Sequence, residues 1–290
     1  MSAIQAEGSR LWHLRRKVAN SLMWIVAVLC VLAAILPLVL VLYYVIAQGA
    51  SGINLDFFTQ LPKPVGEPGG GMANAIVGSL ILVGLASLVG LPIGILGGIY
   101  LAEFGNNRFG WTVRFLADVL NGVPSIVVGI FIWAMVVVPT HRLSGMAGGA
   151  ALGVMMIPTV MRTTEELVRL VPMSLREASL SLGATHWRTV LKVVLVAAKG
   201  GVVTGILLAV SRIAGEAAPL LLTAGSTSFW STRIDQPMPS LPVQIFTYAI
   251  QPYEDWQRQA WAAALVLVSL VFVLSVAARY ATRGRFRMVR

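Results

Sequence analysis

Arg212 and Glu216 are two charged residues in a segment, 209–219, that otherwise consists of small and apolar residues. A charge at the centre of a bilayer costs about 2.5–3.5 kcal/mol on insertion scales, so such residues normally face a cavity or the interior of a helix bundle. Their four-residue spacing predicts that both lie on one helix face. A guanidinium can bind two oxygens of an oxyanion at once. Either Arg212 lines an anion pathway or the two charges form a structural pair; Gly215 and Pro219, which loosen a helix, favour the pathway.

The composition indicates a membrane protein. Of 290 residues, 57% are hydrophobic and 12% are charged, whereas about 25% of the residues of a soluble domain are charged. Residues 18–55, 68–102 and 259–278 contain no Asp, Glu, Lys or Arg. A helix needs about 20 apolar residues to cross the hydrocarbon core. The pattern never alternates with the two-residue period of a membrane barrel, so we expect an all-α polytopic protein.

Six spans are expected, at about residues 21–47, 72–101, 115–138, 147–161, 193–223 and 256–280. The first is too long for the apolar region of a cleaved leader, and we interpret it as a retained helix that Pro37 can kink. Pro158 is expected to end the fourth span. The expected organisation is an N-terminal part, 1–71, with a loop rich in Gly and Pro, a membrane core, 72–280, and a basic tail, 281–290.

Basic residues are distributed unequally between the two sides of this arrangement. With the N-terminus inside, sixteen Lys or Arg lie on inner segments, and the outer segments hold Lys63, Arg142, Arg233 and Arg258. This bias predicts that both termini are cytoplasmic. The net charge of +10 therefore comes mainly from basic residues at the ends of the spans. For this reason we expect no nucleic-acid partner.

A polar segment, 162–192, separates the fourth and fifth spans. Pro172 and Ser174 are typical of a helix start, and the spacing of Leu175, Ala178 and Leu182 predicts a short amphipathic helix. Gly183 is expected to end it, because glycine can adopt a positive φ. The orientation above places this helix in the cytoplasm, where it can bind a partner or lie on the membrane surface.

This helix resembles the EAA loop of importer-type ABC permeases. The matching residues are Glu177-Ala178-Ser179, then Gly183 after three residues, then 193–195 after nine more. Ser179 stands where the family usually has Ala, Val193 where it has Ile, and Val196 where it has Pro. The resemblance implies that Arg176, Glu177, Ala178 and Gly183 belong to a coupling helix that docks on a separate ATPase subunit.

Three further segments look like the A-type permease subunits of phosphate-specific (Pst) ABC importers: 212–221, 229–232 and 241–246. The resemblance implies a type I ABC importer permease fold in the inner membrane, inorganic phosphate as substrate, and a role for Arg212 and Glu216 in transport. The implied partners are a second permease, two copies of a cytoplasmic ATPase subunit and an external phosphate-binding protein. The chain has no GxxxxGK[ST] motif, so we expect ATP on the ATPase, no cofactor on this chain and no enzymatic activity of its own.

Other interpretations stay open. The EAA loop suits an ABC permease for another oxyanion or a small polar solute equally well. An ion-driven secondary transporter needs no coupling helix and usually contains inverted repeats, which this chain lacks, and a non-transporting scaffold leaves Arg212 unexplained. The three His are scattered, so no metal site is expected, and the lone Cys30 predicts no disulfide. Aromatic residues in the outer loop, 224–255, fit either the membrane interface or docking of the binding protein.

Overall fold

The computed structural model describes residues 3–67 and 69–283, and within these ranges all regular structure is helical. The helices of the first half are α1 (Ala3–Gly49), α2 (Leu55–Thr59), α3 (Ala73–Glu103), α4 (Arg108–Gly122), α5 (Ser125–Ile132), α6 (Val138–Thr140) and α7 (Gly145–Arg169). Those of the second half are α8 (Met173–Ser181), α9 (His186–Thr189), α10 (Leu195–Ala214), α11 (Ala218–Thr223), α12 (Leu241–Ala249) and α13 (Glu254–Arg283). A 3₁₀ turn, η1 (Ala50–Gly52), follows α1, and π-helical turns, η2 (Trp133–Val137) and η3 (Val190–Val194), precede α6 and α10. The all-α prediction is confirmed.

Four of the described helical segments are long and apolar enough to cross a membrane: Arg15–Gly52, Ala73–Glu103, His186–Ala214 and Glu254–Ala277. A fifth crossing results if Arg108–Gly122 and Ser125–Thr140, which are bent by 104° at their junction, form one broken span. The helix α7 is not among these segments. A multi-pass membrane protein is therefore established, and the count of six spans stays a prediction.

The expected third span, 115–138, is wrong as a continuous helix. It divides at Val123 and Pro124, where Val123 has an extended backbone with φ −71° and ψ 130°. A residue before proline is driven out of the helical region because the proline ring crowds its backbone. The chain therefore turns sharply between α4 and α5.

Two other prolines do not interrupt their helices. The helix α1 continues through Pro37, and α7 continues through Pro158 to Arg169, so the expected end of the fourth span at Pro158 is wrong. Membrane helices tolerate proline where neighbouring helices and local adjustments satisfy the freed backbone groups, and Pro158 is buried inside the bundle. The first residues of the polar segment, 162–169, are consequently the last two turns of α7.

Two segments expected to be loops contain short helices. The 48–71 segment holds η1 and α2, and the side chain of Asn54 caps α2 by accepting a hydrogen bond from the Phe57 N–H at 2.7 Å. The 224–255 segment holds α12, in which Leu241 and Val243 are buried. Burial of these apolar side chains against the bundle favours helix at both places over the turn signals of the sequence.

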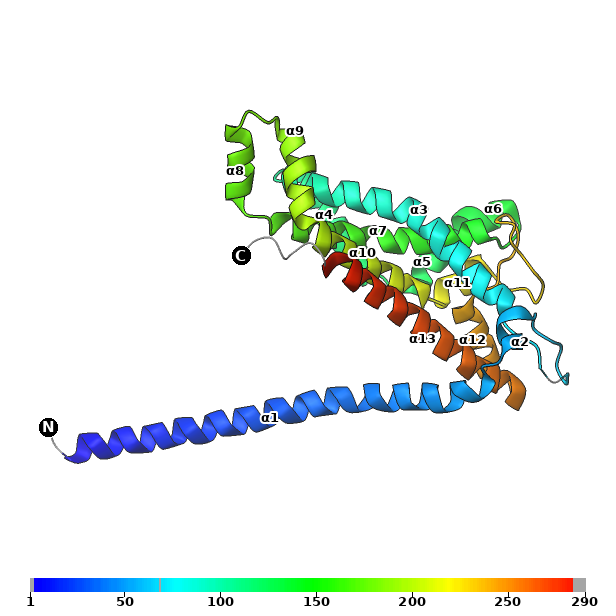
Figure 1. Ribbon diagram of the computed structural model, residues 1–290, viewed down its shortest axis with the longest axis horizontal. Coiled ribbons are helices and arrows are strands. Elements are labelled where there is room, and N and C mark those ends of the chain that lie inside the picture. Colours follow the sequence, from blue (N-terminus) through cyan, green and yellow to red (C-terminus); the bar gives the residue numbers. More distant parts are fainter. Residues whose placement is uncertain (1–2, 68, 284–290) are drawn as a thin grey trace.

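The helices α3 and α7 form the most extensive helix–helix contact among the described elements, and they run side by side in Figure 1. Their approach depends on glycine. A Cβ at Gly94 would lie 2.7 Å from Cβ of Val160, closer than real side chains pack. Leu82, Leu152 and Met156 are buried nearby in the same core. Small residues let membrane helices approach closely, because packing drives their association in lipid where the hydrophobic effect does not.

Figure 1 shows which elements lie toward each end of the molecule. Toward one end lie α8, α9, the start of α1 and the end of α13. Toward the other end lie α2, α6 and α12. The helix α1 diverges from the rest and meets α13 near its own C-terminal end. There Gly49 packs on α13, with its Cβ position 2.7 Å from the Trp261 carbonyl oxygen. Most of the predicted basic tail, residues 284–290, lies outside the described residues.

Candidate functional site

The expected fifth span, 193–223, breaks beside the two intramembrane charges. The helix α10 ends at Ala214, Gly215 follows with φ −93° and ψ −2°, and α11 begins at Ala218. Pro219 lies in the first turn of α11, where a missing N–H costs nothing. The prediction that Gly215 and Pro219 loosen this helix is confirmed, but the argument that i, i+4 spacing brings Arg212 and Glu216 together on one helix face is wrong, because Glu216 lies in the break.

The two charged side chains remain separate. Arg212 is exposed and Glu216 is half-buried, and within the described part of the chain neither side chain has a salt-bridge or hydrogen-bond partner. After the break, α11 packs on α5. The two helices approach closely, because a Cβ added at Gly129 would lie 2.7 Å from Cα of Pro219. The two helices that follow the breaks at 123–124 and 215–217 are therefore in contact.

The amphipathic helix of the polar segment is α8, which begins after Pro172, and the side chain of Ser174 plays no part in a cap. Gly183 has φ +83° and open space around its Cβ position, as the sequence predicts for a residue that ends a helix. Leu175 and Leu182 are exposed, Leu182 by 89%. The chain itself thus leaves these two apolar side chains of the α8 region uncovered.

The four predicted coupling residues do not all face outward. Glu177, Ala178 and Gly183 are exposed, whereas the Arg176 side chain is 14% exposed and forms a salt bridge with Glu103. The structure does not bring these residues near Arg212. The α10–α11 junction lies between the two ends of the molecule in Figure 1, and α8 lies at one end.

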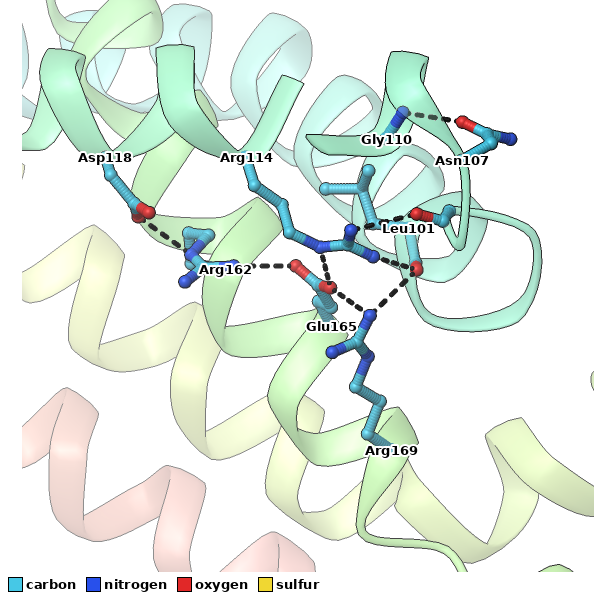
Figure 2. Close-up of polar contacts among 9 residues, drawn as sticks. Leu101, Asn107, Gly110, Arg114, Asp118, Arg162, Glu165 and Arg169 are labelled. Atoms are coloured by element: carbon cyan, nitrogen blue, oxygen red, sulfur yellow. Dashed lines mark hydrogen bonds and ion pairs between the residues drawn. The ribbon is translucent and has the colours of Figure 1, made fainter. Parts of the chain in front are cut away.

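A third group of charges surrounds Glu165, and we call it the Glu165 cluster: Glu165, Arg114, Arg162, Arg169 and Asp118 (Figure 2). Glu165 is 1% exposed. Its Oε1 accepts from Arg114 Nε at 2.5 Å and pairs with Arg169 Nη2 at 2.9 Å, and its Oε2 accepts from Arg162 Nη1 at 2.9 Å. Arg162 Nε also pairs with Asp118 at 2.9 Å.

The same cluster caps the C-terminal end of α3. Arg114 donates to the carbonyl oxygens of Gly105 at 2.8 Å and Leu101 at 2.7 Å. Carbonyls in the last turn of a helix have no intrahelical partner and carry partial negative charge, so guanidinium groups stabilise them. The Glu165 cluster thereby fastens α3, α4 and α7 together at the end of the molecule that carries α8.

Sequence reasoning missed this cluster. Arg114, Arg162 and Arg169 stood out only as basic residues of the inner segments. One signal was present, because Arg162 and Arg169 stand three residues before and four residues after Glu165, on one helix face. Arg114, which is 51 positions from Glu165, could not be found by local spacing. Within residues 3–67 and 69–283, no group of three His, Cys, Asp or Glu is placed to hold a metal ion.

Two features define a membrane transport component. A charged residue lies beside a helix break inside the bundle, and an exposed amphipathic helix with charged residues lies between two long helices. The chain belongs to the family described as "binding-protein-dependent transport system inner membrane component", whose model matches residues 94–287. It is thus an ABC importer permease of the inner membrane, and such a permease implies a partner permease, an ATPase and a binding protein.

Several curated relatives are named "Phosphate transport system permease protein PstA" or "Phosphate transport system permease protein PstA 1". The Yersinia pestis protein is 43% identical over 91% of this chain and 90% of its own length. The Xylella fastidiosa (strain Temecula1) protein is 45% identical over 81% and 82%, and the Mycobacterium tuberculosis (strain H37Rv) protein is 36% identical over 91% and 88%.

Solved structures share the fold at low identity. The inward-facing MetNI methionine ABC transporter matches with a TM-score of 0.59 and 20% identity over 73% of this chain and 92% of that chain. A bacterial ABC transporter involved in import of the acidic polysaccharide alginate matches with a TM-score of 0.63 and 13% identity over 99% and 100%. The fold is therefore that of an ABC importer permease.

Proposed function

We propose that this chain is a permease subunit of an importer of inorganic phosphate, and that Arg212 contacts phosphate on its way through the membrane. The observation that carries the proposal is the position of Arg212 and the absence of an acidic partner for it among the described residues. Arg212 lies in the last turn of α10 beside a helix break inside a membrane segment. An intramembrane charge without a counter-ion is expected to serve transport, and a guanidinium matches the oxygens of phosphate.

The 36–45% identity to phosphate permeases over most of the chain supports phosphate over another oxyanion. In this proposal a second permease completes the pathway, an external phosphate-binding protein delivers the ion, and two copies of a cytoplasmic ATPase subunit bind ATP. Glu177, Ala178 and Gly183 lie on the exposed surface of the α8 region that meets the ATPase. Closure of the ATPases then moves the bundle so that the path past Arg212 and Glu216 opens inward.

The test uses the intact transporter in liposomes, with Arg212→Gln as the main variant. Losing hydrogen bonds from a charged group costs about 1.5–3 kcal/mol, so we expect phosphate uptake to fall about 10- to 100-fold while the complex still assembles. Arg212→Lys keeps the charge but loses the bidentate geometry, so it should recover only part of the uptake. Lys199→Gln, on the exposed surface of the same helix, is the control.

Normal uptake by Arg212→Gln removes this residue from the pathway. Substrate identity is measured separately, as ATP hydrolysis by the wild-type complex stimulated with phosphate or with sulfate in the presence of the binding protein. Stimulation by sulfate alone supports the second candidate, a permease for another oxyanion, and contradicts the proposal.

A further inference from the structure

Arg176 belongs to the helix expected to dock on the ATPase, yet its side chain turns toward its own chain. Its Nη1 forms a salt bridge with the carboxylate of Glu103, and its Nη2 donates to the Val168 carbonyl oxygen at 2.9 Å. The side chains of Arg176 and Glu103 are 14% and 3% exposed. A group covered to this extent by its own chain is poorly placed to contact a separate subunit.

The two partners of Arg176 lie at the ends of two other helices. Glu103 is the last residue of α3, and Val168 precedes the last residue of α7. These are the two helices that pack most extensively on each other. The Glu165 cluster binds the same region, because Arg114 and Arg169 both donate to the Leu101 carbonyl oxygen of α3.

The most extensive contacts of α8 are with η3 and α9, the elements that follow it in the chain. Ser179 Oγ lies 2.9 Å from Thr189 Oγ1 of α9, and Glu177, Leu175 and Leu182 point away from the bundle or lie exposed. The helix thus has an inward side that is fixed by Arg176 and an outward side that is free. Arg176 provides side-chain contacts from α8 to the ends of α3 and α7.

We propose that Arg176 is a positioning residue that joins α8 to α3 and α7 through Glu103 and the Val168 carbonyl, so that the three helices move as one rigid unit when the ATPases close. The inference rests on the proposed function, because it assumes that α8 docks on an ATPase. It differs from the family expectation for this residue, since the ATPase contact then belongs to Glu177 and the exposed apolar side chains.

The first test compares Arg176→Gln, Glu103→Gln and the double variant in the reconstituted transporter. Each single variant should raise the number of ATP molecules hydrolysed per phosphate transported by about fivefold or more. A change of this size corresponds to the lower end of typical coupling free energies between two sites. The ATPase should still co-purify. The double variant should be no worse than either single variant, because residues that act as a pair are not additive. Arg176→Lys should restore part of the coupling, and Arg188→Gln, an exposed arginine of the same segment, is the matched control.

The second test measures the movement directly. In a Cys30→Ser background, spin labels at Ser181→Cys on α8 and Glu166→Cys on α7 replace exposed residues. Their separation should be the same in the ATP-free and ATP-bound complexes, and it should broaden or shift in Arg176→Gln. A wild-type separation that changes with nucleotide overturns the inference.

Loss of ATPase co-purification in Arg176→Gln but not in Glu103→Gln also overturns it, because Arg176 would then contact the ATPase. Failure of the proposed function gives a different result. The proposed function is contradicted by a wild-type complex without phosphate-dependent uptake. It is also contradicted by a Glu177→Lys complex that keeps the ATPase and full coupling. In either case the separation between the labels on α8 and α7 still tests whether Arg176 fixes α8 to the bundle.

Discussion

At the scale of single residues, the Glu165 cluster concentrates charge where three helices meet. One buried carboxylate faces three guanidinium groups, and their remaining N–H groups bind backbone carbonyls of α3 and the following turn. Every charge in such a cluster depends on the others, because removal of one partner leaves the rest desolvated and unpaired.

Glu165→Gln should therefore destabilise the permease. Removing one member of a buried ion pair costs about 3–5 kcal/mol, and we expect the lower end because Arg162 and Arg169 are 29% and 51% exposed. Unfolding of the purified complex in detergent measures the effect. Glu166→Gln, at the exposed neighbouring position, is the control, and equal stabilities for the two variants contradict the prediction.

The 224–255 loop contains an exposed charged pair, Arg233 and Asp235. Arg233 donates two hydrogen bonds to Asp235, at 3.2 and 3.0 Å, and these lower the pKa of Asp235 below its ordinary value of 3.8. Between them, the Ile234 carbonyl oxygen accepts from the Met146 N–H at 2.8 Å and so ties the loop to α7.

Because the pKa of Asp235 is lower in the folded state, its contribution to stability is present above pH 3.8 and is lost as the pH falls through the folded pKa. Wild-type and Asp235→Asn proteins should thus differ slightly in thermal stability at pH 7, since exposed pairs contribute little. The difference should disappear in strong acid. A difference that grows on acidification contradicts this sign.

At the scale of elements, the structure combines two broken helices with one tightly packed pair. The break at 123–124 contains Pro124 and the break at 215–217 contains Gly215, and the helices after them, α5 and α11, pack together. The α3–α7 pair has no such break and carries the polar contacts to α8. The break at 215–217 lies next to Arg212, and in the proposed mechanism the α3–α7 pair moves together with α8 as one rigid body.

Gly94→Ala tests the tight pairing of α3 and α7. Its Cβ would lie 2.7 Å from Cβ of Val160, and such overpacking costs about 1–3 kcal/mol. Gly84→Ala on the same helix has no neighbour within 4 Å and should be neutral or stabilising by up to about 1 kcal/mol. Resistance of each variant to unfolding by a denaturing detergent gives the comparison, and similar resistance of the two contradicts the packing argument.

At the scale of the whole molecule, the two faces expected to meet soluble partners lie at opposite ends of α7. The outer loop binds the start of this helix, since the Gly145 N–H donates to the Gln236 carbonyl oxygen at 3.0 Å, and α8 follows its end. A 25-residue helix is about 37 Å long, and the hydrocarbon core is about 30 Å thick. The outer loop and α8 are thus far enough apart to lie on the two sides of a membrane.

The proposed orientation can be measured by cysteine labelling in a Cys30→Ser background. Thr232→Cys in the outer loop and Ser181→Cys on α8 replace exposed residues. A membrane-impermeant maleimide should label Thr232→Cys in intact spheroplasts, and it should label Ser181→Cys only after permeabilisation, because basic segments stay in the cytoplasm. The reverse pattern contradicts the cytoplasmic position of α8 and of the termini.

The sequence by itself determined the class of protein and the α8 helix with its Gly183 ending, and it predicts a transport role for the 209–219 segment. These follow from uncharged runs, short-range spacing and a local motif, which depend on neighbouring residues along the chain. The tertiary structure decided that Arg176 faces inward, that Glu216 lies outside the helix of Arg212, and that Glu165 is buried. Glu103, which pairs with Arg176, and Arg114, which pairs with Glu165, lie 73 and 51 positions from them along the chain. No local period encodes such contacts, because they depend on how α3, α4 and α7 pack.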